Sequence, residues 1–116
     1  MQIIFESRDA DGAPLRDLSV ARVRFALRRL TALVPRARVQ FSDVNGPRGG
    51  VDKRCQIELK TESAGTVVIA SLAQDWRTAL DRSLARASRV LRRSLQRSQK
   101  PARGRAARLV PITSRQ

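Results

Sequence analysis

The segment DWRTALDRSLARASRVLRRSLQR, residues 75–97, decides the fold because two helical stripes run through it. Apolar residues recur at spacings of three and four, which places them on one face of an α-helix. They are Trp76, Leu80, Leu84, Ala87, Leu91 and Leu95. Arginines recur with the same period on the opposite face. They are Arg82, Arg86, Arg89, Arg93 and Arg97. The segment predicts a helix roughly 35 Å long, with one face on a core and the other positively charged.

A shorter helix is predicted upstream of three strand-like segments. Residues 2–6 predict a strand, and a turn follows at 9–14, where Gly and Pro interrupt the chain. We expect Asp17 or Ser19 to cap a helix that runs to about Leu33, where Pro35 ends it. Its buried stripe would consist of Val20, Val23, Leu27 and Leu30.

Period-two alternation predicts two half-buried strands, at 37–44 and 53–61, and residues 66–72 predict a further strand. The inward residues would be Ala37, Val39, Phe41, Cys55, Ile57 and Leu59. Residues 63–65 would make a hairpin turn, and Asp75 would cap the long helix.

The resulting order, β-α-β-β-β-α, predicts an α+β domain. We expect a four-stranded, mainly antiparallel sheet with both helices on one face, resembling a double-stranded RNA-binding domain. The domain would span residues 1–97. Residues 98–116 lack periodicity and contain Pro101, Gly104 and Pro111, so they predict a flexible basic tail.

The positive charge is concentrated in the C-terminal third of the chain. The net charge is +14; residues 1–75 carry 12 basic and 9 acidic side chains, whereas residues 76–116 carry 12 basic and one acidic. This asymmetry is typical of a surface that binds nucleic acid or an anionic membrane. Arginine outnumbers lysine 21 to 3, which suits phosphate recognition but is also what a GC-rich genome would produce.

Several function classes lack their usual residues. The chain has no histidine and one cysteine, which removes the commonest general base, an intramolecular disulfide and a cysteine-based zinc cluster. We therefore expect no enzyme activity, no metal, no cofactor and no small-molecule substrate. No signal peptide or membrane-spanning stretch is evident, so we expect a cytoplasmic protein.

The candidate RNA contacts are arginines of the two helices. In the long helix they are Arg82, Arg86, Arg89, Arg92, Arg93 and Arg97. In the first helix they are Arg22, Arg24, Arg28 and Arg29. Phe25 lies among the latter; we expect it to pack under a loop or against a second chain, with stacking on a base or ribose as the alternative.

Other conspicuous residues have simpler interpretations. The loop 45–52, NGPRGGVD, lacks the Lys-Ser/Thr of a phosphate-binding loop and is expected to be a plain turn, or else a hairpin that presents Arg48 to RNA. Cys55 and Trp76 are expected in the core. Asp81 is expected to pair with Arg77, one helical turn earlier.

The junction at residues 70–81, ASLAQDWRTALD, resembles the short ribosome hibernation-promoting factor family. In that family an Asp opens the second helix, as Asp75 does here, and an Ala-(Ile/Leu)-Asp follows, as at Ala79-Leu80-Asp81. The resemblance covers about residues 1–97. Two features depart from it: Arg77 stands where members often carry an aromatic residue, and the loop 45–52 is not a general feature of the family.

The resemblance implies a stress-response protein that occupies the channel of the small ribosomal subunit where messenger and transfer RNA bind. There it would inhibit translation and protect idle ribosomes. The chain lacks the extra C-terminal dimerisation domain of long members, so ribosome pairing through such a domain is not expected. Charge alone indicates RNA; the ribosome comes from the resemblance.

An alternative function is a basic protein-interaction module that docks on an acidic protein partner. A membrane-bound helix is less favoured, because the apolar face of the long helix is needed to cover the sheet.

Overall fold

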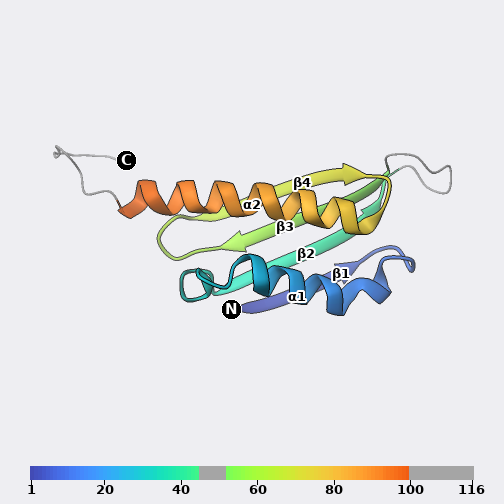
Figure 1. The fold of residues 1–116 in the computed structure, drawn as a ribbon, viewed down its shortest axis with the longest axis horizontal. Helices are drawn as coiled ribbons and strands as arrows, with labels where there is room; N and C mark the ends of the chain where they lie inside the picture. Colours follow the sequence, from blue (N-terminus) through green and yellow to red (C-terminus); the bar gives the residue numbers. More distant parts are fainter. Residues whose placement is uncertain (45–51, 100–116) are drawn as a thin grey trace.

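The computed structural model describes residues 1–44 and 52–99, which form one sheet and two α-helices (Figure 1). The strands are β1 (Gln2–Ser7), β2 (Arg36–Asp43), β3 (Lys53–Lys60) and β4 (Thr66–Ala73). The helices are α1 (Arg16–Ala26) and α2 (Trp76–Gln99), with short 3-10 turns at Ala13–Leu15 and Thr31–Leu33. The predicted order β-α-β-β-β-α is confirmed.

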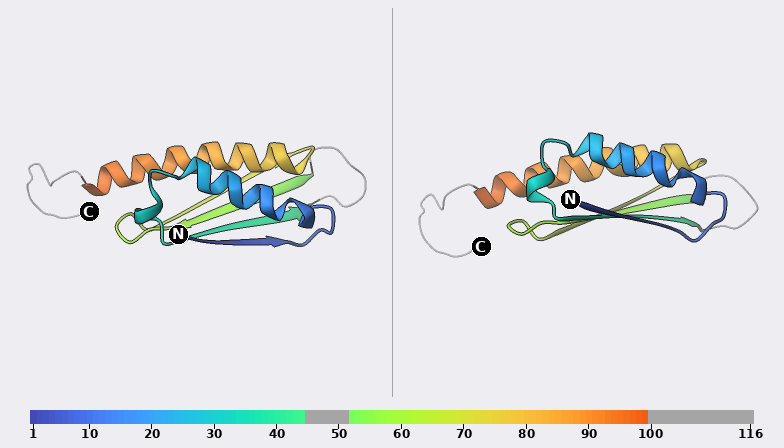
Figure 2. Two further views of the ribbon diagram at one scale, coloured as in Figure 1. Left: turned by 60° about the horizontal axis from the view of Figure 1, so that its bottom comes forward. Right: turned by 90° about the horizontal axis from the view of Figure 1, so that it is seen from below.

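The sheet has the strand order β1-β2-β3-β4, so β1 and β4 are its edges. β1 pairs with β2 in parallel, whereas β2, β3 and β4 form the expected antiparallel meander. Both helices cover the same face of the sheet (Figure 2). The opposite face carries no helix of the described chain, and we refer to it as the open face.

The core lies between the sheet and the helices, and the spacing of apolar residues along the sequence predicted most of its members. All six apolar residues of the α2 stripe are buried, as are the inward residues of β2 and β3. The Trp76 ring stacks on Phe41, with centroids 4.8 Å apart and planes 9° from parallel, and Phe5 meets Phe41 edge-on. Trp76 is therefore the expected core anchor at the start of α2.

The predicted end of the first helix is wrong, because α1 stops at Ala26 instead of Leu33. β1 and β2 are parallel neighbours, so the segment that connects them must return the chain to the end of the sheet where β1 begins. At that end, the Gln2 N–H donates to the Pro35 carbonyl over 2.9 Å. The 11 residues of α1 span about 16 Å and the 6 residues of β1 about 20 Å. Seven further helical residues would add about 10 Å and overshoot β2.

The predicted cap of α1 is also wrong. Leu15 occupies the N-cap position without a side-chain cap bond, and Asp17 lies inside the first turn. Ser19 is buried within the helix. The 3-10 turn at Ala13–Leu15 leads directly into α1, so the chain enters the helix without a separate capping residue.

The cap of α2 is confirmed. The Thr78 N–H donates to Asp75 Oδ1 over 2.8 Å, and the Thr78 hydroxyl donates to Oδ2 over 2.9 Å. The predicted tail begins within α2, which includes residues 98 and 99. The remainder of the predicted tail and all but Asp52 of the loop 45–52 lie outside the described residues. No helix of the described segments is long and apolar enough to cross a membrane.

Candidate nucleic-acid interface

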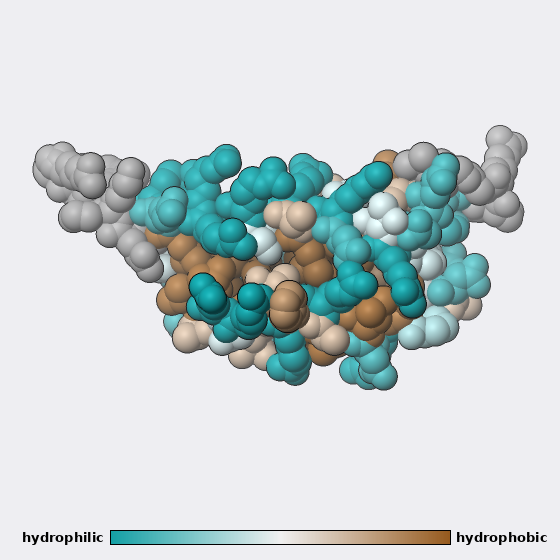
Figure 3. Space-filling model, viewed as in Figure 1, coloured by the Kyte–Doolittle hydropathy of each residue, from teal (hydrophilic) through white to brown (hydrophobic). Residues whose placement is uncertain are grey.

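The helix-bearing face carries most of the positive charge. Residues 16–29 and 76–99 contain twelve arginines and two aspartates. All ten predicted contact arginines belong to this set, and nine of them are exposed; Arg22 is half-buried. Hydrophilic side chains dominate this face, with apolar surface visible between them (Figure 3). The fold therefore gathers arginines from two distant segments on one side of the molecule.

The open face of the sheet has a mixed charge. Arg38 of β2 forms an ion pair with Glu6 of β1, with Nη2 2.8 Å from Oε1. The hydrogen bond that Arg38 donates to this carboxylate raises the pKa of Arg38 above its ordinary value. Glu58 lies directly opposite Arg38 on β3. Two glutamates thus lie beside Arg38 on the open face, whereas the helical segments carry only two aspartates against twelve arginines.

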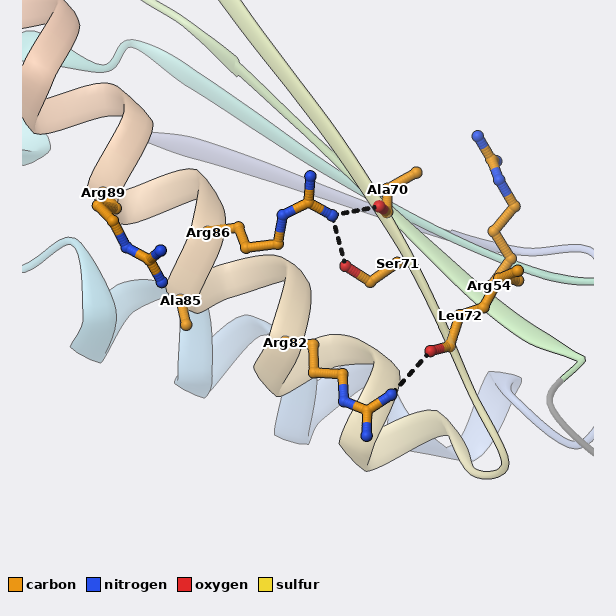
Figure 4. A pocket seen from close by; sticks show the side chains of 8 residues that line it. All are labelled: Arg54, Ala70, Ser71, Leu72, Arg82, Ala85, Arg86 and Arg89. Atoms are coloured by element: carbon orange, nitrogen blue, oxygen red, sulfur yellow. Dashed lines mark hydrogen bonds between the residues drawn. The ribbon is translucent and has the colours of Figure 1, made fainter.

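Two arginines of the predicted stripe contact the edge of the sheet. Arg82 Nη1 donates to the Leu72 carbonyl over 3.1 Å, and Arg86 Nη1 donates to the Ala70 carbonyl over 3.0 Å. Both side chains reach from α2 toward β4, as Figure 4 shows. Together with Arg54 and Arg89, they line a hollow of about 610 Å³ between α2 and the edge strand. A guanidinium has further N–H donors, so these arginines can still bind an anion.

A third candidate, Arg22, links the two helices. Its Nη1 forms an ion pair with the Asp81 carboxylate of α2. Asp81 therefore pairs with α1, whereas the sequence had predicted Arg77 as its partner. The sequence pattern within one helix could not reveal a partner 59 positions away.

Two of the other arginines of the first helical segment, Arg28 and Arg29, line a groove between α1 and α2. Arg24 is exposed on α1, and Arg28 and Arg29 lie just beyond its end. Arg28 and Phe25 form one wall of a hollow of about 410 Å³, with Leu84, Ser88 and Arg92 opposite. A neighbouring hollow, of about 500 Å³, is lined by Arg29 and shares Arg28 and Arg92 with the first. We name these two adjoining hollows together the interhelical groove.

The remaining candidates occupy the C-terminal half of α2. Arg89 borders both the interhelical groove and the hollow beside β4. Arg93 and Arg97 are exposed, and Arg97 Nη2 lies 3.3 Å from Ser94 Oγ. The ten candidates therefore do not form one uniform stripe. Three contact strand carbonyls or a carboxylate, and the other seven lie around the groove or along exposed helix surface.

Other polar groups near the core have structural roles. Burial raises the pKa of the Cys55 thiol to about 12, so it stays protonated at neutral pH, as expected for a core residue. Ser83 Oγ donates to the Cys55 carbonyl over 2.9 Å. Lys53 Nζ lies 2.7 Å from Asp43 and 3.6 Å from the buried Asp52. The hydrogen bond to Asp43 raises the pKa of Lys53. The described segments contain no group of three or more side chains that could hold a metal ion.

Sequence reasoning missed two features of this surface. It did not foresee that Arg82 and Arg86 would cover the β4 edge, although both follow that strand closely and lie one helical turn apart. It also gave no role to Arg54, which comes from β3 and points away from Arg82 and Arg86 in Figure 4. A signal was available, since alternation along 53–61 already placed Arg54 on the face opposite Cys55.

No protein-family model and no curated protein matches the chain. Solved structures do match it. A ribosomal subunit interface protein from Coxiella burnetii has a TM-score of 0.65 at 17% identity, over 83% of this chain and 99% of that one. The Protein Y N-terminal domain from Thermus thermophilus has a TM-score of 0.58 at 23% identity, over 80% of this chain and 98% of that one. The chain therefore has the fold of these two proteins.

Proposed function

We propose that this chain is a ribosome-associated translation inhibitor, a hibernation factor that binds ribosomal RNA of the small subunit. It would occupy the channel of messenger and transfer RNA and block it without catalysis. One structural neighbour is described as a ribosomal subunit interface protein. That description, together with the resemblance at residues 70–81, supports the ribosome as the target.

The observation that carries the proposal is the charge of the helix-bearing face. Twelve arginines against two aspartates in the helical segments suit a partner with many phosphates, because each guanidinium can bind a phosphate through paired donors. The sheet holds both helices on one side, so the contacts are arranged before binding. The open face, where Glu6 and Glu58 lie beside Arg38, would then face away from the RNA.

The proposed contacts are the ten arginines of the helical segments. Arg89, Arg92, Arg93 and Arg97 would act with Arg24, Arg28 and Arg29. Arg22, Arg82 and Arg86 would contribute less, because Arg22 is paired with a carboxylate and the other two are directed toward carbonyls of the β4 edge.

Co-sedimentation with purified bacterial small ribosomal subunits tests this proposal. Wild-type protein should pellet with the subunit at low salt and less at high salt. Arg89→Glu/Arg93→Glu should weaken binding about tenfold or more. The matched control is Arg36→Glu/Lys60→Glu, which makes the same charge change at exposed, directly opposed residues of the open face.

The control variant should bind like the wild type. Wild-type protein that stays in the supernatant at low salt would overturn the ribosome as target. Equal loss in both variants would mean that net charge alone, and not the helix-bearing face, determines binding. Capture of an acidic protein in place of RNA would favour the interaction-module alternative.

A further inference from the structure

Phe25 is the most exposed large apolar residue of the described chain, with 67% of its surface accessible. Phe41 is fully buried and Phe5 packs against the core. Phe25 lies near the end of α1, on the face that carries the arginines. The expectation that it packs under a loop of its own chain is therefore wrong for the described residues. Packing against a second chain stays a prediction, and stacking on a base or ribose is the other explanation of the exposed ring.

The ring is held in a defined setting. Arg28 Nη1 donates to the Phe25 carbonyl over 2.7 Å, and the Arg28 guanidinium carbon lies 4.2 Å from the ring centroid. The carbonyl bond keeps the cation over one face of the ring, so the two groups form a stacked Phe25–Arg28 unit that combines an aromatic and a cationic surface. Planar unpaired bases stack on such aromatic and guanidinium surfaces.

The interhelical groove beside Phe25 supplies the rest of a nucleotide site. Leu84 and Ser88 lie across from the ring on α2, and Arg89 and Arg92 border the same hollow. An aromatic surface next to two further guanidinium groups matches the two halves of a nucleotide, a flat base and a charged phosphate. The carboxylates of an acidic peptide would use the arginines, whereas a planar ring and a guanidinium side by side favour a planar base with its phosphate.

We propose that the interhelical groove binds one unpaired nucleotide of the RNA partner. Its base stacks on the Phe25–Arg28 unit, and Arg89 and Arg92 hold its phosphate. A base inside a duplex cannot offer a free face, so the site selects a bulged or looped-out nucleotide. This inference rests on the proposed function, because it assumes that RNA meets the helix-bearing face.

Binding to three RNA hairpins tests the inference. One hairpin carries a single bulged adenosine, the second has an abasic residue at the same place, and the third is fully paired. The bulged and abasic hairpins have equal phosphate charge, so their comparison isolates the base. Wild-type protein should bind the bulged hairpin about tenfold more tightly than the abasic one.

Variants of Phe25 assign that preference to the ring. Phe25→Leu should lose the preference while binding abasic RNA like the wild type, and Phe25→Tyr should keep it. The matched control is Val68→Ala, which alters another exposed apolar residue, on the open face, and should change nothing. Because Phe25 is exposed, its substitutions should leave the melting temperature of the protein unchanged.

Fluorescence gives a second readout. In Phe25→Trp, the introduced indole should be quenched by the bulged hairpin and not by the abasic one. Wild-type protein, whose Trp76 is buried, corrects for any change in the core. No preference for the bulged hairpin, or an equal loss of affinity for both RNAs in Phe25→Leu, would overturn the nucleotide site.

The same preparations can be tested for binding to small ribosomal subunits. Subunit binding without a bulge preference overturns only the nucleotide site. A bulge preference that depends on Phe25, without subunit binding, supports the site and overturns the ribosome as target.

Discussion

At the residue scale, the start of α2 depends on the Asp75 carboxylate. The hydrogen bond from the Thr78 N–H is the main cause that lowers the pKa of Asp75. Since the folded-state pKa lies below the unfolded value, the stabilisation is complete above the unfolded pKa. It is lost as the pH falls through the folded one. Asp75→Ala should therefore lower the melting temperature by a few degrees at pH 7.

The acid dependence of Asp75 variants separates capping from charge. The difference between wild type and Asp75→Ala should shrink as the pH falls below the ordinary pKa of an aspartate and through the lowered pKa of Asp75 in the folded protein, where the carboxylate takes up its proton. Asp75→Asn should melt close to the wild type at pH 7, because asparagine is an equally good cap. Thermal melts by circular dichroism between pH 3 and 7 measure both effects. A constant difference across this range would contradict the pKa argument.

Position 12 requires glycine because there is no room for a side chain, and not because of its backbone conformation. Its φ of −85° is accessible to any residue, but a Cβ would lie 2.6 Å from Ser7 Oγ and 2.9 Å from Phe41 Cδ2. Phe41 is fixed by its stacking on Trp76, so it cannot move aside freely. Gly12→Ala should reduce the free energy of unfolding by about 1–3 kcal/mol, measured by urea denaturation.

Gly65 provides the matched control. Its φ is +74°, and a Cβ there would meet no atom within 4 Å. Gly65→Asn should cost less than Gly12→Ala, because asparagine tolerates the left-handed region and the site is open. A Gly12→Ala variant as stable as the wild type would show that the Ser7–Phe41–Trp76 packing can relax.

At the element scale, the β4 edge is a site where other strands could pair. Arg82 and Arg86 donate to its Leu72 and Ala70 carbonyls, and such coverage protects an edge from pairing with another chain. Arg82→Ala/Arg86→Ala should therefore self-associate at lower protein concentration than the wild type. Sedimentation velocity across a concentration series measures this change.

A second double variant separates edge coverage from charge. Arg92→Ala/Arg93→Ala removes the same charge from α2, but neither residue lines the hollow beside β4. This variant should remain as dispersed as the wild type. Equal self-association of both variants would mean that loss of charge repulsion, and not exposure of the edge, is the cause.

The two helices differ in how far their sequences predicted them. α2 has a cap, a regular apolar stripe and no proline, so local signals agree with its packing, and its start and buried face were confirmed. α1 continues its apolar pattern through Leu27 and Leu30, but a parallel strand pair limits the length of the crossover. That limit comes from the spacing of β1 and β2 and not from any residue within the helix.

At the scale of the whole molecule, composition indicated an anionic partner, and the fold showed which face of the molecule carries most of the positive charge. Strand alternation could place Arg38 opposite the core, but pairing with Glu6 depends on the β1–β2 register. Likewise, the Arg22–Asp81 pair and the interhelical groove exist only after α1 and α2 pack side by side. Contacts between distant segments are therefore the part of the candidate site that the helical and strand periodicity of the sequence could not predict.

The salt dependence of RNA binding tests how the molecule as a whole meets its partner. Each arginine that neutralises a phosphate adds roughly 0.7–0.9 to the slope of log affinity against log salt concentration. Arg93→Gln, on the helix-bearing face, should therefore lower the slope by about one. Arg36→Gln, exposed on β2 at the open face, removes the same charge and should leave the slope unchanged.

Filter binding of the bulged hairpin over a salt series measures both slopes. If Arg36→Gln lowered the slope as much as Arg93→Gln, the RNA would also contact the open face, and the helix-bearing face would not be the sole phosphate-binding surface.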